Sequence, residues 1–252
     1  GLLGIGGGMV MVPFLTMLFT ARGFPAEHIV HMAIATSLAT ILFTSLSSVR
    51  AHHRRGAVLW PVARWLAPGI VVGSLIGAQV AGWLKTGWLA LVFAIFVGFS
   101  ATQMLFDRKP APTRELPRHA GMIGVGSIIG FISSIVGAGG GFISVPFMTW
   151  CNVRIHNAVA TSAALGFPIA LAGAIGYVIA GLHEARVPPG NIGYINVPSL
   201  LCIVATSVLT APLGAKTAHA MDVKSLKRVF ALLLYSLAAY MAYKAAVTLR
   251  LH

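Results

Sequence analysis

The chain has 252 residues, of which 57% are hydrophobic and 9% are charged, and its formal net charge is +13. Because a soluble domain carries about 25% charged residues, this composition excludes an ordinary soluble domain and predicts an all-α polytopic membrane protein. The basic residues lie mostly at the ends of apolar stretches, as the positive-inside rule describes, so the expected partner is the lipid bilayer and not nucleic acid.

The first half of the chain begins with an apolar, glycine-rich segment at residues 1–20. Three apolar spans follow it, at residues 28–49, 57–83 and 87–106, and each is long enough to cross a bilayer as a helix. The first half then ends in the longest polar stretch, residues 107–119, which contains three prolines and four basic residues. We interpret this stretch as a linker.

The second half has the same order of segments. A glycine-rich segment at residues 120–150 precedes three apolar spans at 157–181, 191–217 and 229–249. This order predicts three further transmembrane helices, so that the chain as a whole contains two glycine segments and six ordinary spans.

Two glycine clusters show that the halves are repeats of one another. Gly4-Ile5-Gly6-Gly7-Gly8, followed by Val12-Pro13, returns 133 residues later as Gly137-Ala138-Gly139-Gly140-Gly141, followed by Val145-Pro146. Three consecutive glycines weaken a helix, and a broken helix in hydrocarbon leaves backbone groups without partners. A break repeated in both halves of a membrane protein indicates a transport site. Close helix packing is the alternative explanation of membrane glycines.

A second match extends the repeat beyond the glycines. His31-Met32-Ala33-Ile34-Ala35-Thr36-Ser37 resembles His156-Asn157-Ala158-Val159-Ala160-Thr161-Ser162. We therefore predict a first repeat at residues 1–106 and a second at 120–252, joined by the linker at 107–119.

The distribution of Arg and Lys predicts that the two repeats are inverted in the membrane. If each glycine segment enters and leaves on one side, twelve basic residues lie on the cytoplasmic face and four lie outside, namely Arg22, Lys85, Arg186 and Arg250. If each segment crosses once, the repeats are parallel and the split is nine to seven. The inverted arrangement agrees better with the positive-inside rule.

The length of the second glycine segment supports the same conclusion. Residues 120–150 number 31, too few for two crossings of about 20 residues each. They suffice for a re-entrant hairpin of two half-helices that turns at the glycines, and a single long kinked helix is the alternative. We expect two hairpins that enter from opposite faces and meet near the midplane. The 133-residue offset also predicts about 14 more apolar residues before residue 1, to complete the first hairpin.

The expected binding site for a small anionic substrate lies at the hairpin tips. A glycine turn that opens a half-helix exposes backbone N–H groups at the positive end of the helix dipole. Hydroxyl groups of the repeated Thr-Ser pairs could add donors, although bonding to their own helix is the alternative. We expect positive φ at Gly7 and Gly140. The predicted substrate-binding residues are Gly6, Gly7, Gly8, Thr36, Ser37, Arg64, Gly139, Gly140, Gly141, Thr161 and Ser162.

Arg64 is in this set because it is the basic residue well inside a span, where a charge is a functional candidate by default. The alternative is that its side chain extends to the cytoplasmic surface beside Trp60 and Trp65. The spans contain no Asp or Glu to carry a proton-coupled mechanism.

The doubled glycine motifs with Val12-Pro13 and Val145-Pro146, together with the Ala-Thr-Ser elements, resemble the TauE/SafE family of membrane proteins. The resemblance covers nearly the whole chain. It implies a multi-pass exporter in the cell membrane that moves sulfite, sulfoacetate or another organosulfonate by alternating access.

Other functions remain open on the sequence alone. Cys151 and Cys202 could serve a transmembrane thiol or electron carrier, and the same architecture suits a permease for an unrelated small anion. An intramembrane protease would need a GxSG motif, but in Gly124-Val125-Gly126-Ser127 the serine stands one place late. We expect that the protein is not an enzyme and has no catalytic residues. We also expect that it needs no cofactor or metal. A homo-oligomer is compatible with the sequence.

Overall fold

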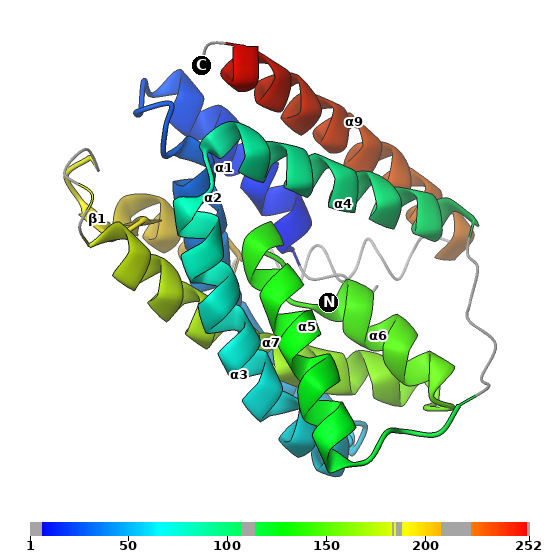
Figure 1. The fold of residues 1–252 in the computed structure, drawn as a ribbon. Helices are drawn as coiled ribbons and strands as arrows, with labels where there is room; N and C mark the ends of the chain where they lie inside the picture. The colour runs from blue at the N-terminus through cyan, green and yellow to red at the C-terminus, as the bar shows by residue number, and fades with distance from the viewer. Residues whose placement is uncertain (1–6, 107–113, 183, 185–187, 208–222, 251–252) are drawn as a thin grey trace.

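The computed structural model describes residues 7–106, 114–182, 184, 188–207 and 223–250. It is built almost entirely of α-helices, which pack obliquely around one another (Figure 1). The helices are α1 (Gly8–Ala21), α2 (Ile29–Arg54), α3 (Trp60–Trp83), α4 (Thr86–Phe106), α5 (His119–Val136), α6 (Gly141–Trp150), α7 (Ile155–Gly181) and α9 (Val223–Arg250).

Six of these helices, α2, α3, α4, α5, α7 and α9, are long and apolar enough to cross a membrane. Five of them confirm predicted spans, with ends that differ by a few residues. The prediction of a helix beginning at residue 191 is wrong. The short strands β1 (Asn191–Ile192) and β2 (Ile195–Asn196) form a hairpin there, and an apolar helix follows at Val197–Ser207. Gly193, at φ +53°, allows the tight turn between the strands.

The second glycine segment forms two helices, as the hairpin prediction requires and the kinked-helix alternative does not. α5 and α6 run in opposite directions (Figure 1). The Arg114 N–H, in the chain leading to α5, donates to the carbonyl of Trp150 at the end of α6, with an N···O distance of 3.3 Å. The expectation of two half-helices is wrong for α5, however, because its 18 residues span about 27 Å at 1.5 Å per residue. Only α6, with 10 residues, is a half-helix.

α2 packs antiparallel to α7, its counterpart in the repeat. At one end of the pair, His28 precedes α2 and lies 3.5 Å from Glu184, which follows α7. At the other end, the Asn157 side-chain amide, in the first turn of α7, donates to the carbonyl of Ala57, which follows α2.

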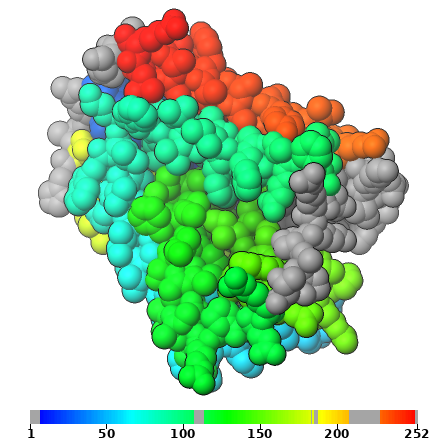
Figure 2. All heavy atoms as spheres, turned by 45° about the vertical axis from the view of Figure 1, so that its right-hand side comes forward, coloured from blue at the N-terminus to red at the C-terminus, as the bar shows by residue number. Residues whose placement is uncertain are grey.

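α4 and α9 form a second antiparallel pair of repeat counterparts. Gly87 at the start of α4 contacts Leu249 at the end of α9. Thr102, late in α4, shares a 2.7 Å hydrogen bond with Tyr235, near the middle of α9. The two helices lie side by side along the upper edge of the molecule in both views (Figures 1 and 2).

α3 and α5 approach so closely that their backbones touch. A Cβ atom on Gly73 would lie 2.0 Å from the carbonyl oxygen of Ser127, and one on Gly130 would lie 2.2 Å from that of Ile70. Gly69, Gly77 and Gly126 meet the facing helix in the same way. These glycines recur every four residues, the small-residue spacing that brings membrane helices together.

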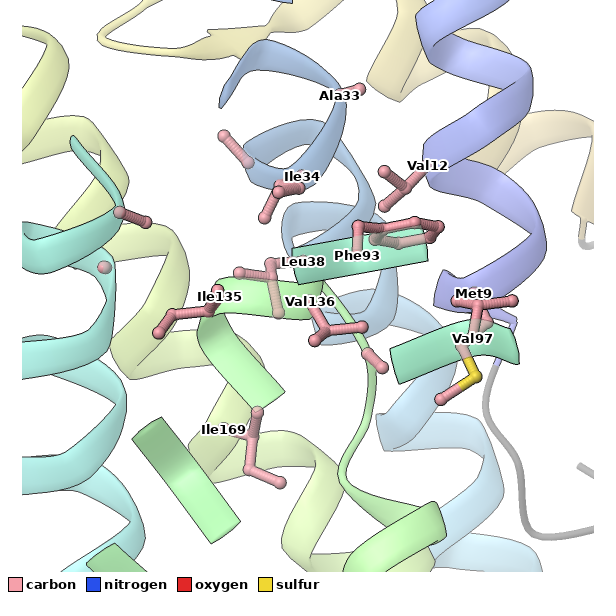
Figure 3. Packing of buried hydrophobic residues seen from close by; sticks show 14 of the residues in the cluster. Met9, Val12, Ala33, Ile34, Leu38, Phe93, Val97, Ile135, Val136 and Ile169 are labelled. Carbon is pink, nitrogen blue, oxygen red and sulfur yellow. The ribbon is translucent and has the colours of Figure 1, made fainter. Parts of the chain in front are cut away.

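The hydrophobic core extends through most of the helices, and the part of it just before the glycine turn is shown in Figure 3. Val136, the last residue of α5, is at its centre, with Phe93 of α4 and Leu38 of α2 beside it. The core therefore fixes the end of α5, and with it the position of the turn that follows. Its labelled members are Met9, Val12, Ala33, Ile34, Leu38, Phe93, Val97, Ile135, Val136 and Ile169.

The α3–α5 contact gives a direct test on one helix. We expect Gly130→Ala to destabilise the protein by about 1–3 kcal/mol, because the added methyl group overlaps the Ile70 carbonyl. Gly124→Ala should be neutral or stabilising by up to about 1 kcal/mol, because nothing lies within 4 Å of that position and alanine favours helix. Thermal unfolding in detergent measures both. Equal melting temperatures for the two variants would contradict the backbone contact.

Candidate functional site

The turn between α5 and α6, residues Gly137–Gly140, is the most unusual backbone in the structure. Gly137 ends α5 at φ +69°, and Gly140 precedes α6 at φ +75°. Only glycine adopts these left-handed conformations without strain. A side chain on Gly137 would also meet Val12 and Ile34, at 3.0 and 3.1 Å from its Cβ position. The glycines are therefore required for the shape of the turn, and the expectation of positive φ at Gly140 is confirmed.

The turn presents backbone N–H groups at the start of α6. The N–H groups of Ile143 and Ser144 donate to the carbonyl of Gly140. The N–H groups of four residues have no hydrogen-bond acceptor within the described part of the chain, namely those of Gly139, Gly140, Gly141 and Phe142. These groups stand at the positive end of the α6 dipole, which carries roughly half a unit charge. The arrangement suits an anion.

Ser133 lies beside the same turn, near Gly140. Its side chain is 2% exposed, and its Oγ has no hydrogen-bond partner within the described residues. The Oγ lies 3.1 Å from the position that a Gly140 Cβ would take. A buried hydroxyl without a partner costs about 1–3 kcal/mol, so a ligand that accepts its hydrogen bond would recover that energy. The sequence analysis missed Ser133. The available signal was its spacing, one helical turn before Gly137 on the same face of α5.

The first glycine cluster lies against the second. A Cβ atom on Gly8 would be 2.1 Å from the Gly137 carbonyl oxygen and 3.0 Å from Cδ1 of Ile41. Gly139 faces the same Ile41 at 3.8 Å. The N-terminus of α1 and the turn before α6 therefore converge on one point. Gly6 lies outside the described residues.

Gly7 differs from its repeat counterpart Gly140. It precedes α1 at φ −66°, is exposed, and has open space where its Cβ would be. The expectation of a positive φ at Gly7 is wrong. A glycine in a run is not conformationally constrained by the run itself, because φ is fixed by how the neighbouring chain enters the helix.

The two clusters meet halfway along the long helices. Gly139 lies against Gly166, which is near the middle of the 27-residue helix α7. A Cβ atom on Gly166 would lie 3.7 Å from the Gly139 carbonyl oxygen. Ile41 is likewise near the middle of the 26-residue helix α2. The two glycine clusters therefore lie at about mid-height of α2 and α7.

The predicted serines border the turn. Ser37 Oγ donates to the Gly137 carbonyl at 3.1 Å. Ser144, in the first turn of α6, donates from its Oγ to that of Ser162 at 2.8 Å. Ser37 and Ser162 are repeat counterparts, and each connects its helix to the second glycine hairpin. Ser144 is a further residue that the sequence analysis did not single out.

The predicted threonines bond to the opposite half of the chain. Thr161 Oγ1 accepts the Leu59 N–H, which precedes α3, at 2.9 Å. Thr36 Oγ1 accepts the Asn196 N–H, which precedes the helix at Val197–Ser207, at 3.0 Å. Thr36 and Thr161 are counterparts in the repeat. Each hydroxyl thus satisfies an N–H at the start of a helix, the role of a helix cap supplied from a distance.

The structure does not bring Arg64 to the glycine turns. Arg64 lines a cavity of about 660 Å³ between α2, α3 and α7, which we name the α2–α3–α7 cavity. On α2 this cavity is lined by Arg50, which follows Ile41 by nine residues and so faces the opposite way at about 100° per residue. On α7 it is lined by Pro168, about 200° around the helix from Gly166. The cavity and the turns therefore lie on opposite faces of α7 and on different faces of α2.

Both cysteines are free thiols in different parts of the fold. Cys151 is buried at the end of α6 and Cys202 is exposed on the helix at Val197–Ser207. Burial raises the pKa of the Cys151 thiol, although Arg114 opposes the shift. A raised pKa reduces the thiolate population that thiol chemistry needs. Among the described residues, no three His, Cys, Asp or Glu side chains gather as metal ligands do.

Comparison with known proteins identifies a family over nearly the whole chain. The model of the family described as "Sulfite exporter TauE/SafE" matches residues 1–241. No solved structure matches the chain significantly.

Individual relatives agree with this family match. The chain is similar to a protein of Haemophilus influenzae named "Probable membrane transporter protein", with 36% identity over 97% of this chain and 93% of the relative. A protein of Methanocaldococcus jannaschii with the same description is 27% identical, over 90% of this chain and 84% of its own length. YdhB of Bacillus subtilis, also named a probable membrane transporter protein, is 26% identical over 90% of this chain and 88% of its own length.

The reciprocal threonine contacts predict a loss of stability on substitution. Thr161→Val leaves the Leu59 N–H without its acceptor, at a cost of about 1–3 kcal/mol for a buried group. Thr36→Val should do the same through Asn196. Thr40→Val is the control, because its buried hydroxyl donates to the Thr36 carbonyl within its own helix. Thermal unfolding in detergent should show larger losses for Thr36 and Thr161 than for Thr40. A loss at Thr40 as large as the others would contradict the cross-repeat role.

Proposed function

We propose that this chain, which belongs to the sulfite exporter TauE/SafE family, moves small anions across the membrane and binds them at the turn Gly137–Gly140. The family and the six long apolar helices make it a multi-pass protein of the cell membrane and a membrane transporter. The location of the site and the identity of the anion are the proposal.

The observation that carries the proposed site is Ser133 beside the start of α6. The hydroxyl is buried and without a partner in the described structure, and it lies next to backbone N–H groups that also have no acceptor there. An oxyanion has several acceptor atoms and no donor, so it matches this set of donors. Hydrogen bonds to a charged acceptor are the stronger kind, and the α6 dipole adds to the attraction.

We assign the remaining predicted residues around this point. Gly139, Gly140 and Gly141 supply N–H groups, and the α1 N-terminus at Gly8 approaches from the other side. Ser37, Ser162, Thr36 and Thr161 hold the turn and the long helices in place through the hydrogen bonds described above. Arg64 is left out of the binding set, because it lines a cavity on a different face of α2 and of α7.

We further propose that the two repeats are inverted, with the site between them. The antiparallel contacts of α2 with α7 and of α4 with α9 support this arrangement, since an inverted repeat places counterpart helices antiparallel across its two-fold axis. The reciprocal bonds of Thr36 and Thr161 support it as well. Rocking one repeat against the other would then open the site to each side of the membrane in turn.

The substrate class rests on the family and on the chemistry of the site. The family is described as sulfite exporters, and sulfite and organosulfonates such as sulfoacetate present oxygen acceptors on a compact charged group. Purified protein in proteoliposomes should transport sulfite or sulfoacetate, whereas taurine, sulfate and acetate test how narrow the selectivity is. Transport of acetate alone would make the chain a permease for an unrelated anion.

Ser133→Ala tests the site. We expect the variant to bind the transported anion about 10- to 150-fold more weakly, because a hydrogen bond to a charged group contributes about 1.5–3 kcal/mol. Ser127→Ala is the matched control on the same helix, since that hydroxyl donates to the Ile123 carbonyl of its own helix. Titration of sulfite and sulfoacetate into folded protein measures both. Unchanged affinity in Ser133→Ala would place the anion site elsewhere.

Cysteine labelling tests the inverted arrangement. Arg22 follows α1 and Arg154 follows α6, so the two are close to equivalent in the repeats. In a background with Cys151 and Cys202 replaced by serine, Arg22→Cys and Arg154→Cys should react with an impermeant maleimide from opposite faces of sealed vesicles. Arg55→Cys should label with Arg154→Cys. Labelling of the Arg22 and Arg154 positions from one face would mean parallel repeats.

A further inference from the structure

The α2–α3–α7 cavity is amphipathic along its length. Its basic end is formed by Arg50 and His53, near the C-terminus of α2, and by Arg64, in the second turn of α3. The remaining lining is apolar apart from the indole N–H of Trp60, and includes Leu46 of α2 and Phe167 of α7. Leu46 lies seven residues before His53, about 10 Å further into the membrane at 1.5 Å per residue.

The basic end carries positive charge that no described residue neutralises. Among the described residues, no acidic side chain lines the cavity and neither Arg50 nor Arg64 forms a salt bridge. The Arg64 guanidinium lies 5.9 Å from the centre of the Trp65 ring. Arg50 and Arg64 are both exposed. Two unneutralised guanidinium groups at the mouth of an apolar cavity complement an anionic head with an apolar tail.

His53 and Trp60 close the polar end. The Trp60 indole N–H donates to His53 Nδ1 at 3.1 Å. Because Nδ1 accepts this bond, the proton of the neutral ring lies on Nε2, which remains a donor. Trp60 itself is 47% exposed, and tryptophan is typical of the level of the lipid headgroups. The pair marks the membrane interface at this end of the cavity.

The transported anion does not fit this cavity. The glycine turns lie on the opposite face of α7 and on a different face of α2, and the long apolar lining offers a small hydrated anion nothing in exchange for its water. The cavity also opens at the surface, where Leu46 is 53% exposed. In a membrane that surface faces lipid. Its volume of about 660 Å³ is in the usual range for a bound organic molecule, about 300–1,000 Å³.

We infer that the α2–α3–α7 cavity binds an anionic phospholipid from the leaflet at the C-terminal end of α2. The phosphate lies between the guanidinium groups of Arg50 and Arg64, and one acyl chain lies along the apolar lining. One guanidinium group can donate two parallel hydrogen bonds to two oxygens of a phosphate. Basic pockets between membrane helices bind anionic headgroups. A lipid in the cavity contacts α2 and α3 of the first repeat and α7 of the second, and so connects the two repeats. This inference does not depend on which anion the protein transports.

The test compares lipids on the purified full chain. Dioleoyl-phosphatidylglycerol and dioleoyl-phosphatidylcholine have the same tails and differ in net charge, and native mass spectrometry in detergent counts the lipids that bind. We expect wild type to prefer phosphatidylglycerol. Arg50→Gln with Arg64→Gln should weaken its binding about 10- to 30-fold and remove the preference. Arg55→Gln, an arginine beside the cavity that does not line it, should leave both unchanged.

A second variant tests the apolar part. Ala67→Phe fills the cavity while keeping both arginines, and should weaken the binding of both lipids without abolishing the preference for the anionic one. Thermal unfolding without added lipid establishes that each variant folds. Equal binding of the two lipids by wild type, or equal losses in Arg55→Gln and the double variant, would overturn the inference. Competition by sulfite against phosphatidylglycerol would also overturn it, because the cavity would then belong to the transport path.

Discussion

Every backbone polar group inside a membrane needs a partner, and this fold is arranged around the places where that requirement is hardest to meet. The turn at Gly137–Gly140 joins the oppositely directed helices α5 and α6 in the middle of the protein. Its carbonyl at Gly137 is satisfied by Ser37, whereas several N–H groups that follow have no acceptor in the described structure. A negatively charged ligand can accept hydrogen bonds from these N–H groups and from the neighbouring Ser133 hydroxyl, which has no partner among the described residues either. The requirement that shapes the fold thus also defines the candidate site.

The same requirement explains the contacts between the repeats. α3 and the helix at Val197–Ser207 both begin with an N–H that lacks an intrahelical partner. Each is satisfied by a threonine from the other half of the chain, Leu59 by Thr161 and Asn196 by Thr36. A helix start that depends on the opposite repeat couples the positions of the two halves. Any motion of one repeat against the other must keep these bonds or exchange them.

Glycine has two separate uses in this molecule, and a sequence does not distinguish them. In α3 and α5, Gly73 and Gly130 have ordinary helical backbone and are needed for the close approach of two helices. At Gly137 and Gly140 the backbone itself is left-handed. Close packing therefore explains the glycines between α3 and α5, whereas the shape of the turn explains Gly137 and Gly140. α2 and α7 show a similar division, because one face of each meets the glycine turn and a different face lines the basic cavity.

The sequence by itself determined that the chain is a polytopic membrane protein, where most of its long helices lie, that the glycine motif is duplicated, and which family the chain resembles. These follow from apolar stretches and internal matches, which are local or one-dimensional properties. It could not determine that α5 is a full-length helix and α6 a half-helix, nor that Gly7 and Gly140 differ in φ. It also placed Arg64 with the glycines. Those features depend on which helix faces are brought together, and helices of similar hydropathy all round carry no periodic signal of their facing. Only the tertiary structure decided that Ser133 lies beside the turn and that Arg64 lies across α2 and α7 from it.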